Sequence, residues 1–356
     1  MSGGGGRRRT GRLAAGTPLL VLLLALMALP LAAQSVAVTP QGSFVVAHDG
    51  IVELFASNGY ERLWRSDGVE YPGAVVAGES SIAVLDPIAN RAVVADIRTG
   101  ASTSMRTGET PIDGAFVGGD LYLVERDARA LERIAPDGTR ASISLAADPA
   151  FLRIRDARLF VYSRVAGVIQ EIATAPFRVA RTVAAEPFAS DFETDGRTAY
   201  TVHPRDGFIR MVDLATGKPA GHVRIGAVPV DLAFAGSGTA LSAPMLAVAD
   251  PSAKRVWVVE GKQSVMQAFA RGFLRGLIGL GLFGGRESKF RTGVDRVVIR
   301  GPVSIAYDSS SGTLYRFSKE KIEVLAHPVA PGAFAVGPSG VAWWQDGTLV
   351  AQKANR

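Results

Sequence analysis

The sequence lacks cysteine, and it lacks the short motifs that mark most enzyme classes. Without cysteine the chain has no disulfide, no thiolate metal site and no lipid-modified cysteine. None of its four histidines lies in an HExxH motif or at another close metal-binding spacing, and no GxSxG, Walker or dinucleotide-binding glycine motif is present. These absences argue against the familiar zinc, serine-hydrolase and nucleotide-dependent enzymes, and we expect neither a catalytic site nor a cofactor.

The first 33 residues have the features of a secretory signal. A basic stretch at residues 7–12 precedes the apolar run TPLLVLLLALMALPLAA, and LAAQS places small residues before Gln34. The apolar run is about sixteen residues long, whereas a membrane-spanning helix needs about 20. We therefore expect cleavage after Ala33 and export to the periplasm or the medium; an uncleaved anchor is the alternative.

Positive charge is unevenly distributed along the chain. The formal net charge is +6, but residues 1–33 carry four arginines and no acid, and residues 262–296 alone have a net charge of +5, which leaves −3 for the rest. A nucleic-acid-binding protein is expected to spread basic residues over one face of its fold. The distribution argues against a nucleic-acid partner.

A repeat of about forty residues organises the rest of the chain. Proline precedes a small or apolar strand at Pro72, Pro111, Pro149, Pro187, Pro229, Pro302 and Pro331, and the first intervals are 39, 38, 38 and 42 residues. Within each period, runs of Val, Ile, Tyr and Phe alternate with polar residues and are separated by turn pairs such as Asp195-Gly196 and Asp206-Gly207.

Four antiparallel strands per period predict an all-β fold, a β-propeller of seven or eight four-stranded blades over residues 34–356. A β-sandwich is the alternative, but it does not explain near-equal periods. The last period lacks a fourth strand, and we expect the N-terminal strand SVAV to complete it and latch the ring.

Two segments carry a family resemblance. IRMVDLATGKPAGHVRIGAVPVDLAFAGSG and MLAVADPSAKRVWVVEGKQS resemble the YVTN/NHL class of bacterial propeller repeats, with Asp213–Gly217 and Asp96–Gly100 at the turn after the third strand. The resemblance covers most of the chain after residue 33. It implies a propeller that serves as an extracytoplasmic binding platform, and it implies no catalytic residues.

Acidic residues offer the one route to an enzyme. Asp49, Asp86, Asp206 and Asp250 end predicted second strands in different blades, and equivalent positions of a propeller ring one face. Calcium prefers carboxylate ligands, and propellers of the gluconolactonase type use a central metal to open lactones. The acids also suit Asp-Gly and Asp-Pro turns, which is the interpretation we favour; a metal-dependent lactonase is the alternative function.

Aromatic residues are scarce, and the sequence has four tryptophans. Trp343 and Trp344 are adjacent on a predicted strand, so their side chains should face opposite ways. We expect one in the core; the other, with Trp64 or Trp257, either fills the core or offers a stacking surface.

One segment departs from the repeat. An insert assigned to residues 262–296 covers nearly all of GKQSVMQAFARGFLRGLIGLGLFGGRESKFRTGVD. This string falls between RVWVVEG and RVVIRG, which we interpret as the third and fourth strands of one blade. Apolar residues at helical spacing predict a largely helical insert. We expect residues 265–290 to bind a membrane surface or a partner protein, through Phe269, Arg271, Phe273, Leu274, Arg275, Leu277, Ile278, Leu280, Leu282 and Phe283. Packing of the insert across its own blade as a lid is the alternative.

Overall fold

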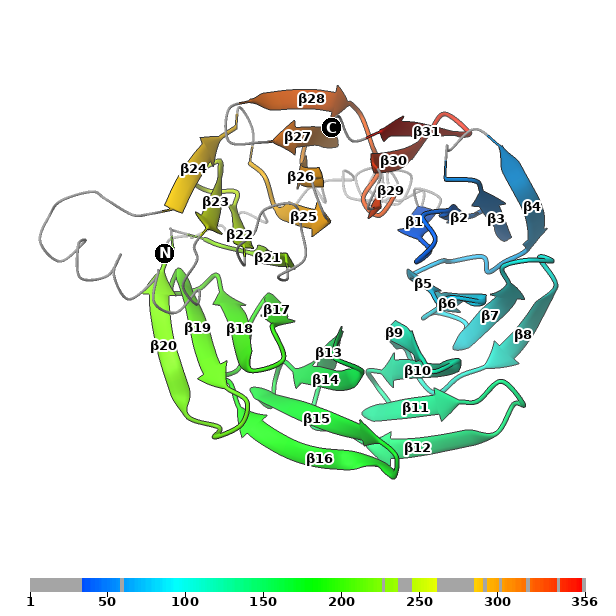
Figure 1. The fold of residues 1–356 in the computed structure, drawn as a ribbon, viewed down its shortest axis with the longest axis horizontal. Helices are drawn as coiled ribbons and strands as arrows, with labels where there is room; N and C mark the ends of the chain where they lie inside the picture. Colours follow the sequence, from blue (N-terminus) through cyan, green and yellow to red (C-terminus); the bar gives the residue numbers. More distant parts are fainter. Residues whose placement is uncertain are drawn as a thin grey trace, which may run out of the picture.

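The fold is a ring of eight antiparallel sheets, seen in a computed structural model of the chain (Figure 1). The structure describes residues 34–57, 61–225, 228–235, 245–260, 285–290, 293–300, 303–317, 321–337 and 340–353. Seven sheets have four strands and the last has three, and each sheet runs in chain order from the centre of the ring to its rim. The prediction of an all-β propeller is confirmed, and the number of blades is eight.

The strands of the eight blades follow one another without crossovers. Blades 1 to 4 comprise β1 (Gln34–Val38), β2 (Phe44–His48), β3 (Ile51–Phe55), β4 (Arg62–Asp67); β5 (Ala74–Ala77), β6 (Ser81–Asp86), β7 (Arg91–Asp96), β8 (Ser102–Arg106); β9 (Pro111–Val117), β10 (Asp120–Glu125), β11 (Ala130–Ile134), β12 (Arg140–Ser144); and β13 (Pro149–Arg155), β14 (Arg158–Ser163), β15 (Val168–Thr174), β16 (Phe177–Ala184). Blades 5 to 8 comprise β17 (Asp191–Thr194), β18 (Thr198–His203), β19 (Phe208–Asp213), β20 (Pro219–Arg224); β21 (Asp231–Ala235), β22 (Met245–Asp250), β23 (Arg255–Glu260), β24 (Gly285–Lys289); β25 (Arg296–Arg300), β26 (Val303–Asp308), β27 (Thr313–Phe317), β28 (Ile322–Ala326); and β29 (Phe334–Gly337), β30 (Gly340–Gln345), β31 (Thr348–Lys353).

Burial explains why the strands of a blade differ in sequence. The second strands are packed between neighbouring blades on both faces, so β10 reads DLYLVE and is buried almost throughout. The outermost strands face water, so β12 reads RASIS and is largely exposed. The core is accordingly divided into clusters at the junctions between adjacent blades, for example Tyr200 of blade 5 with Leu246 of blade 6.

Among the described strands none is shared between blades 1 and 8, so the prediction that the N-terminal strand completes the last blade is wrong. β1 pairs along its whole length with β2, from Gln34↔His48 to Val38↔Phe44, and the last blade keeps three strands. Blades 8 and 1 instead meet through side chains: Trp344 of β30 stacks on His48 with ring centroids 4.7 Å apart. One backbone hydrogen bond, from Val36 N to Gly332 O at 2.9 Å, joins the two blades at their inner edge.

The segment RVVIRG is the inner strand of blade 7, β25, and not the fourth strand of blade 6. The fourth strand is β24, GRESK, which pairs with β23 from Arg255↔Lys289 to Val259↔Gly285. β26 begins directly after Pro302, so this proline precedes a second strand and not a first one. The long insertion interrupts the repeat of about forty residues, so the positions of the following strands within their blades were predicted incorrectly.

The prediction of a largely helical insert must be corrected. None of the residues that the structure describes is helical, and the described part of the predicted insert belongs to the propeller. Residues 285–289 form β24, and Phe290 is buried at the junction of blades 6 and 7, 5.2 Å from Tyr315 between ring centroids. The extra segment is therefore confined to residues 261–284, which lie outside the described residues. In the described parts of the chain, no helix is long and apolar enough to span a membrane.

Candidate functional site

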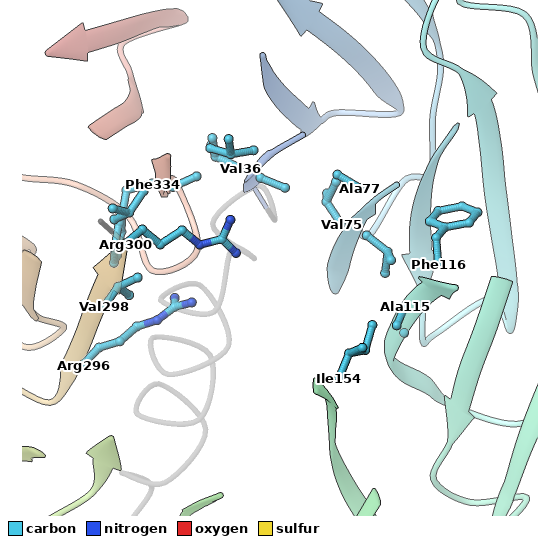
Figure 2. A pocket seen from close by; sticks show the side chains of 16 residues that line it. Val36, Val75, Ala77, Ala115, Phe116, Ile154, Arg296, Val298, Arg300 and Phe334 are labelled. Atoms are coloured by element: carbon cyan, nitrogen blue, oxygen red, sulfur yellow. The ribbon is translucent and has the colours of Figure 1, made fainter. Parts of the chain in front are cut away.

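A cavity of about 340 Å³ lies at the centre of the ring (Figure 2). Its walls are the innermost strands of six blades: β1, β5, β9, β13, β25 and β29. Two of its sixteen lining residues are charged, and both are arginines; the others are Val, Ala, Phe, Ile or Gly. The cavity therefore combines apolar walls with positive charge.

Strand β25 supplies both arginines. Alternate residues of a strand point to opposite faces, so Arg296, Val298 and Arg300 line the cavity while Val297 and Ile299 are buried in the core between blades. The Arg296 guanidinium lies over the ring of Phe334, 5.1 Å from its centroid.

Arg300 has no counter-charge in the described part of the chain. No described side chain forms a hydrogen bond or an ion pair with it, and burial lowers the pKa of its guanidinium. A guanidinium remains protonated under all ordinary conditions. Arg300 is thus an exposed cation on a largely apolar cavity wall.

The opposite wall is apolar. Figure 2 shows Val75 and Ala77 of β5, Ala115 and Phe116 of β9, and Ile154 of β13 facing the two arginines across the cavity. Ile154 is 37% exposed, which is high for isoleucine, and its exposed surface contributes to the cavity wall.

A second charged group occupies the inner strands of blades 3 to 5. Arg153 of β13 lies 3.0 Å from Asp191 and 2.7 Å from Glu193, both on β17, and 3.9 Å from Asp113 on β9. Burial opposes the charged form of Arg153, but the three carboxylates outweigh it and raise the pKa of the guanidinium. Burial likewise raises the pKa of Asp113 and of Glu193. Because these groups pair with one another, the cluster links blades.

Three aspartates make the same contact from one inner strand to the next. Each carboxylate accepts a backbone N–H of the following blade, in the pairs Asp113 with Leu152 (2.9 Å), Asp191 with Leu232 (2.9 Å) and Asp231 with Val297 (2.6 Å). Burial, with the nearby charge of Asp191, raises the pKa of Asp231 well above its usual range. These aspartates stand in the segments PIDG, PFASD and PVD that begin with the repeat prolines, and no role had been predicted for them.

Three of the four aspartates considered as metal ligands accept backbone hydrogen bonds within turns. Asp86 accepts the backbone N–H groups of Ile88 and Ala89, Asp250 accepts that of Ala253, and Asp206 accepts that of Phe208.

Asp49 adopts a left-handed backbone conformation in its turn, with φ 44°. Among the described residues no three His, Asp or Glu side chains are grouped so that they could hold a metal ion.

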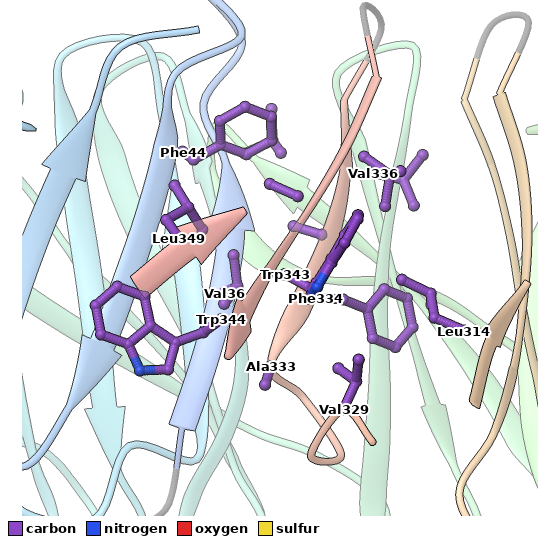
Figure 3. Close-up of a cluster of buried hydrophobic side chains, with 14 of the residues drawn as sticks. Val36, Phe44, Leu314, Val329, Ala333, Phe334, Val336, Trp343, Trp344 and Leu349 are labelled. Atoms are coloured by element: carbon purple, nitrogen blue, oxygen red, sulfur yellow. The ribbon is translucent and has the colours of Figure 1, made fainter. Parts of the chain in front are cut away.

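One histidine and two tryptophans of the predicted strands are core residues. His203 is buried, its Nε2 lies 3.0 Å from Thr201 Oγ1, and burial lowers its pKa. Trp343 and Trp344 are both buried, on opposite faces of β30 (Figure 3). Opposite orientation was predicted correctly, and neither indole is left as a stacking surface.

The ten residues predicted to contact a membrane or a partner, Phe269 to Phe283, all lie outside the described residues. The structure does describe the two ends from which this segment leaves: β23 ends at Glu260 and β24 begins at Gly285.

No family model matches the sequence, and no curated protein matches it. Solved structures match the chain in fold. BamB from Moraxella catarrhalis is 13% identical with a TM-score of 0.59, covering 89% of this chain and 94% of its own. Dihydro-heme d1 dehydrogenase NirN is 13% identical with a TM-score of 0.66, covering 92% of this chain and 74% of its own. A chain of a mitotic checkpoint complex is 11% identical with a TM-score of 0.56, covering 78% and 84%.

These likenesses establish the propeller fold. At such identities they show no more than the fold, so the similarity to YVTN/NHL repeats remains a resemblance.

Proposed function

We propose that this protein is an exported, non-enzymatic propeller scaffold that docks to an anionic membrane surface through residues 261–284. The observation that carries the proposal is the pairing of β23 with β24, which completes blade 6 up to Val259↔Gly285. A hairpin of this kind needs a turn of two to five residues. The blade therefore does not require the long segment, and β24 lies at the outer edge of the ring (Figure 1).

The composition of the segment favours an anionic lipid surface. It combines Phe269, Phe273 and several Leu and Ile residues with Arg271 and Arg275 and contains no acid. Apolar side chains gain by leaving water for the acyl boundary, and each basic residue near an anionic surface contributes about 1 kcal/mol. A protein partner with an acidic, apolar groove is the second candidate occupant, because it offers the same complementarity.

A scaffold role is supported by what the acids of the described residues do. Asp86, Asp206 and Asp250 accept hydrogen bonds in turns, and Asp113, Asp191 and Asp231 join neighbouring blades, so each of these carboxylates has a structural role. The fold itself is shared with a member of a multiprotein complex and with a dehydrogenase, so the fold does not decide between a scaffold and an enzyme.

Export is tested by fractionation and N-terminal sequencing. We expect the protein in the extracytoplasmic fraction with Gln34 as its first residue. An intact N-terminus at Met1 in the cytosol would contradict export.

Docking is tested by flotation with vesicles of phosphatidylglycerol and phosphatidylcholine, compared with phosphatidylcholine alone. We expect the intact protein to float with the anionic vesicles. A variant in which Asn-Gly replaces residues 261–284 should remain at the bottom of the gradient, with an unchanged thermal unfolding midpoint because β23 and β24 still form a hairpin. Arg271→Gln/Arg275→Gln should weaken flotation, and Arg178→Gln/Arg181→Gln on the distant strand β16 is the matched control for the same loss of charge.

Equal flotation of the variant that lacks residues 261–284 would show that another surface binds the vesicles. Absence of flotation of the intact protein, together with capture of an envelope protein that depends on residues 261–284, would favour the protein partner.

A further inference from the structure

Two arginines give the central cavity a positively charged wall. Arg296 and Arg300 line it, and none of its sixteen lining residues is acidic. Arg296 lies against the Phe334 ring, but Arg300 has no partner among the described side chains. Both arginines are exposed, so their charges are open to pair with an anion that enters the cavity.

The same cavity has an apolar wall and a volume that suits a small ligand. Val75, Ala77, Phe116 and Ile154 face the arginines from β5, β9 and β13 (Figure 2). Ligand pockets in proteins occupy about 300–1,000 Å³ and combine mostly apolar walls with a few polar groups that fix orientation. A volume of about 340 Å³ lies at the lower end of that range.

We propose that the central cavity is a binding site for a small amphipathic organic anion, whose carboxylate head pairs with Arg300 and whose apolar body lies against the wall formed by β5, β9 and β13. Arg296 adds a second positive charge on the same face of β25. The cavity rejects cations through the two arginines and strongly hydrated inorganic anions through its apolar walls. This site is separate from residues 261–284, so the proposal is independent of membrane docking.

The arrangement explains why the arginines occur on β25. Its alternation places three residues, Arg296, Val298 and Arg300, toward the cavity, whereas the corresponding positions of β5 and β29 are Val, Ala or Phe. Arg153, the other inner arginine described above, is neutralised by Asp191 and Glu193 and has no free charge to offer.

Isothermal titration calorimetry of the purified protein tests the proposal with three probes. Decanoate has both an anionic head and an apolar chain, decylammonium has the chain with the opposite charge, and acetate has the head without the chain. We expect decanoate to bind with one-to-one stoichiometry, more weakly at high salt, and the other two probes to give no binding isotherm.

Variants identify the site. Arg300→Gln should weaken decanoate binding by about ten-fold or more, because a charge-assisted contact is lost, and Arg300→Lys should retain much of the affinity. Arg98→Gln, at an exposed turn of blade 2, removes the same charge outside the cavity and should leave the affinity unchanged. Ile154→Glu, on the opposite wall, should abolish binding by placing a like charge beside the ligand.

Four results would overturn the proposal: no binding of decanoate by the intact protein, equal binding of decylammonium, unchanged affinity in Arg300→Gln, or unchanged affinity in Ile154→Glu. Circular dichroism establishes that each variant is folded. If Arg300→Gln does not fold, the result for Ile154→Glu decides. Loss of flotation with retained decanoate binding, or the reverse, separates this proposal from the membrane-docking function.

Discussion

Glu125, at the end of β10, is a buried carboxyl whose protonation is coupled to folding. Its Oε1 accepts the backbone N–H of Gly108 at 2.5 Å, and it lies beside Glu132, which is paired with Arg140. Burial, together with the neighbouring Glu132, raises the pKa of Glu125 to about 7 from a usual value of 4.5. Between these two pH values the folded protein binds a proton that the unfolded chain releases.

Stability is therefore predicted to fall as the pH rises from about 4.5 to about 7. Glu125→Gln keeps the shape of the side chain and removes its ionisation. The variant should match the intact protein near pH 4.5 and be more stable by about 2 kcal/mol at pH 8. Urea unfolding across this range measures the difference, and Glu79→Gln at an exposed turn controls for the change in net charge. Parallel pH profiles for Glu125→Gln and the intact protein would contradict the assignment.

At the residue scale, local chemistry could be predicted from the sequence but long-range pairing could not. The turn roles of Asp86 and Asp250 follow from Asp-Pro sequences whose hydrogen bonds span two or three residues. The pairing of Asp191 with Leu232 spans 41 residues and depends on how blades are placed around the ring. The cavity lined by Arg296 and Arg300 could not be predicted either, because it forms only where the inner strands of six blades converge.

At the element scale, the turn between β14 and β15 packs closely against the segment that connects blades 4 and 5, and Gly167 is the residue at this contact. Gly167 has φ +62°, and a Cβ built there would lie 2.5 Å from the backbone nitrogen of Pro187, in the segment that leads from blade 4 to blade 5. Gly138, between β11 and β12, has φ +84° and no atom within 4 Å of such a Cβ. The two glycines share a left-handed backbone and differ in the space around them.

Substitution by alanine should separate the two effects. Gly138→Ala should cost about 1 kcal/mol, the penalty of a left-handed conformation for an L residue. Gly167→Ala should cost about 3 kcal/mol or more, because backbone atoms must also move. Urea unfolding midpoints measure both changes. A Gly167→Ala variant no less stable than Gly138→Ala would show that the two connections do not approach each other as described.

The elements themselves were predictable wherever the repeat was regular. Proline before an inner strand and alternating apolar residues identified blades 2 to 5 because both signals are local. β24 was missed because GRESK has no apolar residue, and outer strands carry little of the alternation that burial imposes. The helical interpretation of the insert arose from apolar spacing alone, and that spacing does not show where the propeller resumes.

At the scale of the whole molecule, the ring depends on the junction between its first and last blades. Four-stranded blades follow each other along the chain, so each of the other junctions is also connected covalently. Blade 8 has three strands in the described part of the chain, and no chain connection leads from it to blade 1. The junction is a hydrophobic cluster of residues from both blades, which includes the contacts of Trp344 with His48 and Phe55, together with the hydrogen bond from Val36 to Gly332. Closure of the ring could be predicted from the sequence, but the blade with which β1 pairs could not, because strand pairing depends on how the blades are placed around the ring.

Trp343 and Trp344 provide a matched pair for testing this junction. Both are buried on β30, but Trp344 faces blade 1 whereas Trp343 lies on the other face, with Phe334 and Leu314 (Figure 3). Replacing either by alanine should cost about 3–5 kcal/mol through loss of burial and the cavity left behind. The two variants should differ in where the ring loosens, because local opening follows the lost contacts.

Hydrogen exchange at the amide of Val36 reports on the junction directly, since this amide donates to Gly332 across it. We expect its exchange to accelerate markedly in Trp344→Ala and less in Trp343→Ala at equal global stability, adjusted with urea. Equal acceleration in the two variants would mean that blades 8 and 1 separate only when the whole ring unfolds, and that the junction has no independent weakness. Preferential opening in Trp344→Ala would instead show that a propeller without a shared blade is held closed by one aromatic contact and its surroundings.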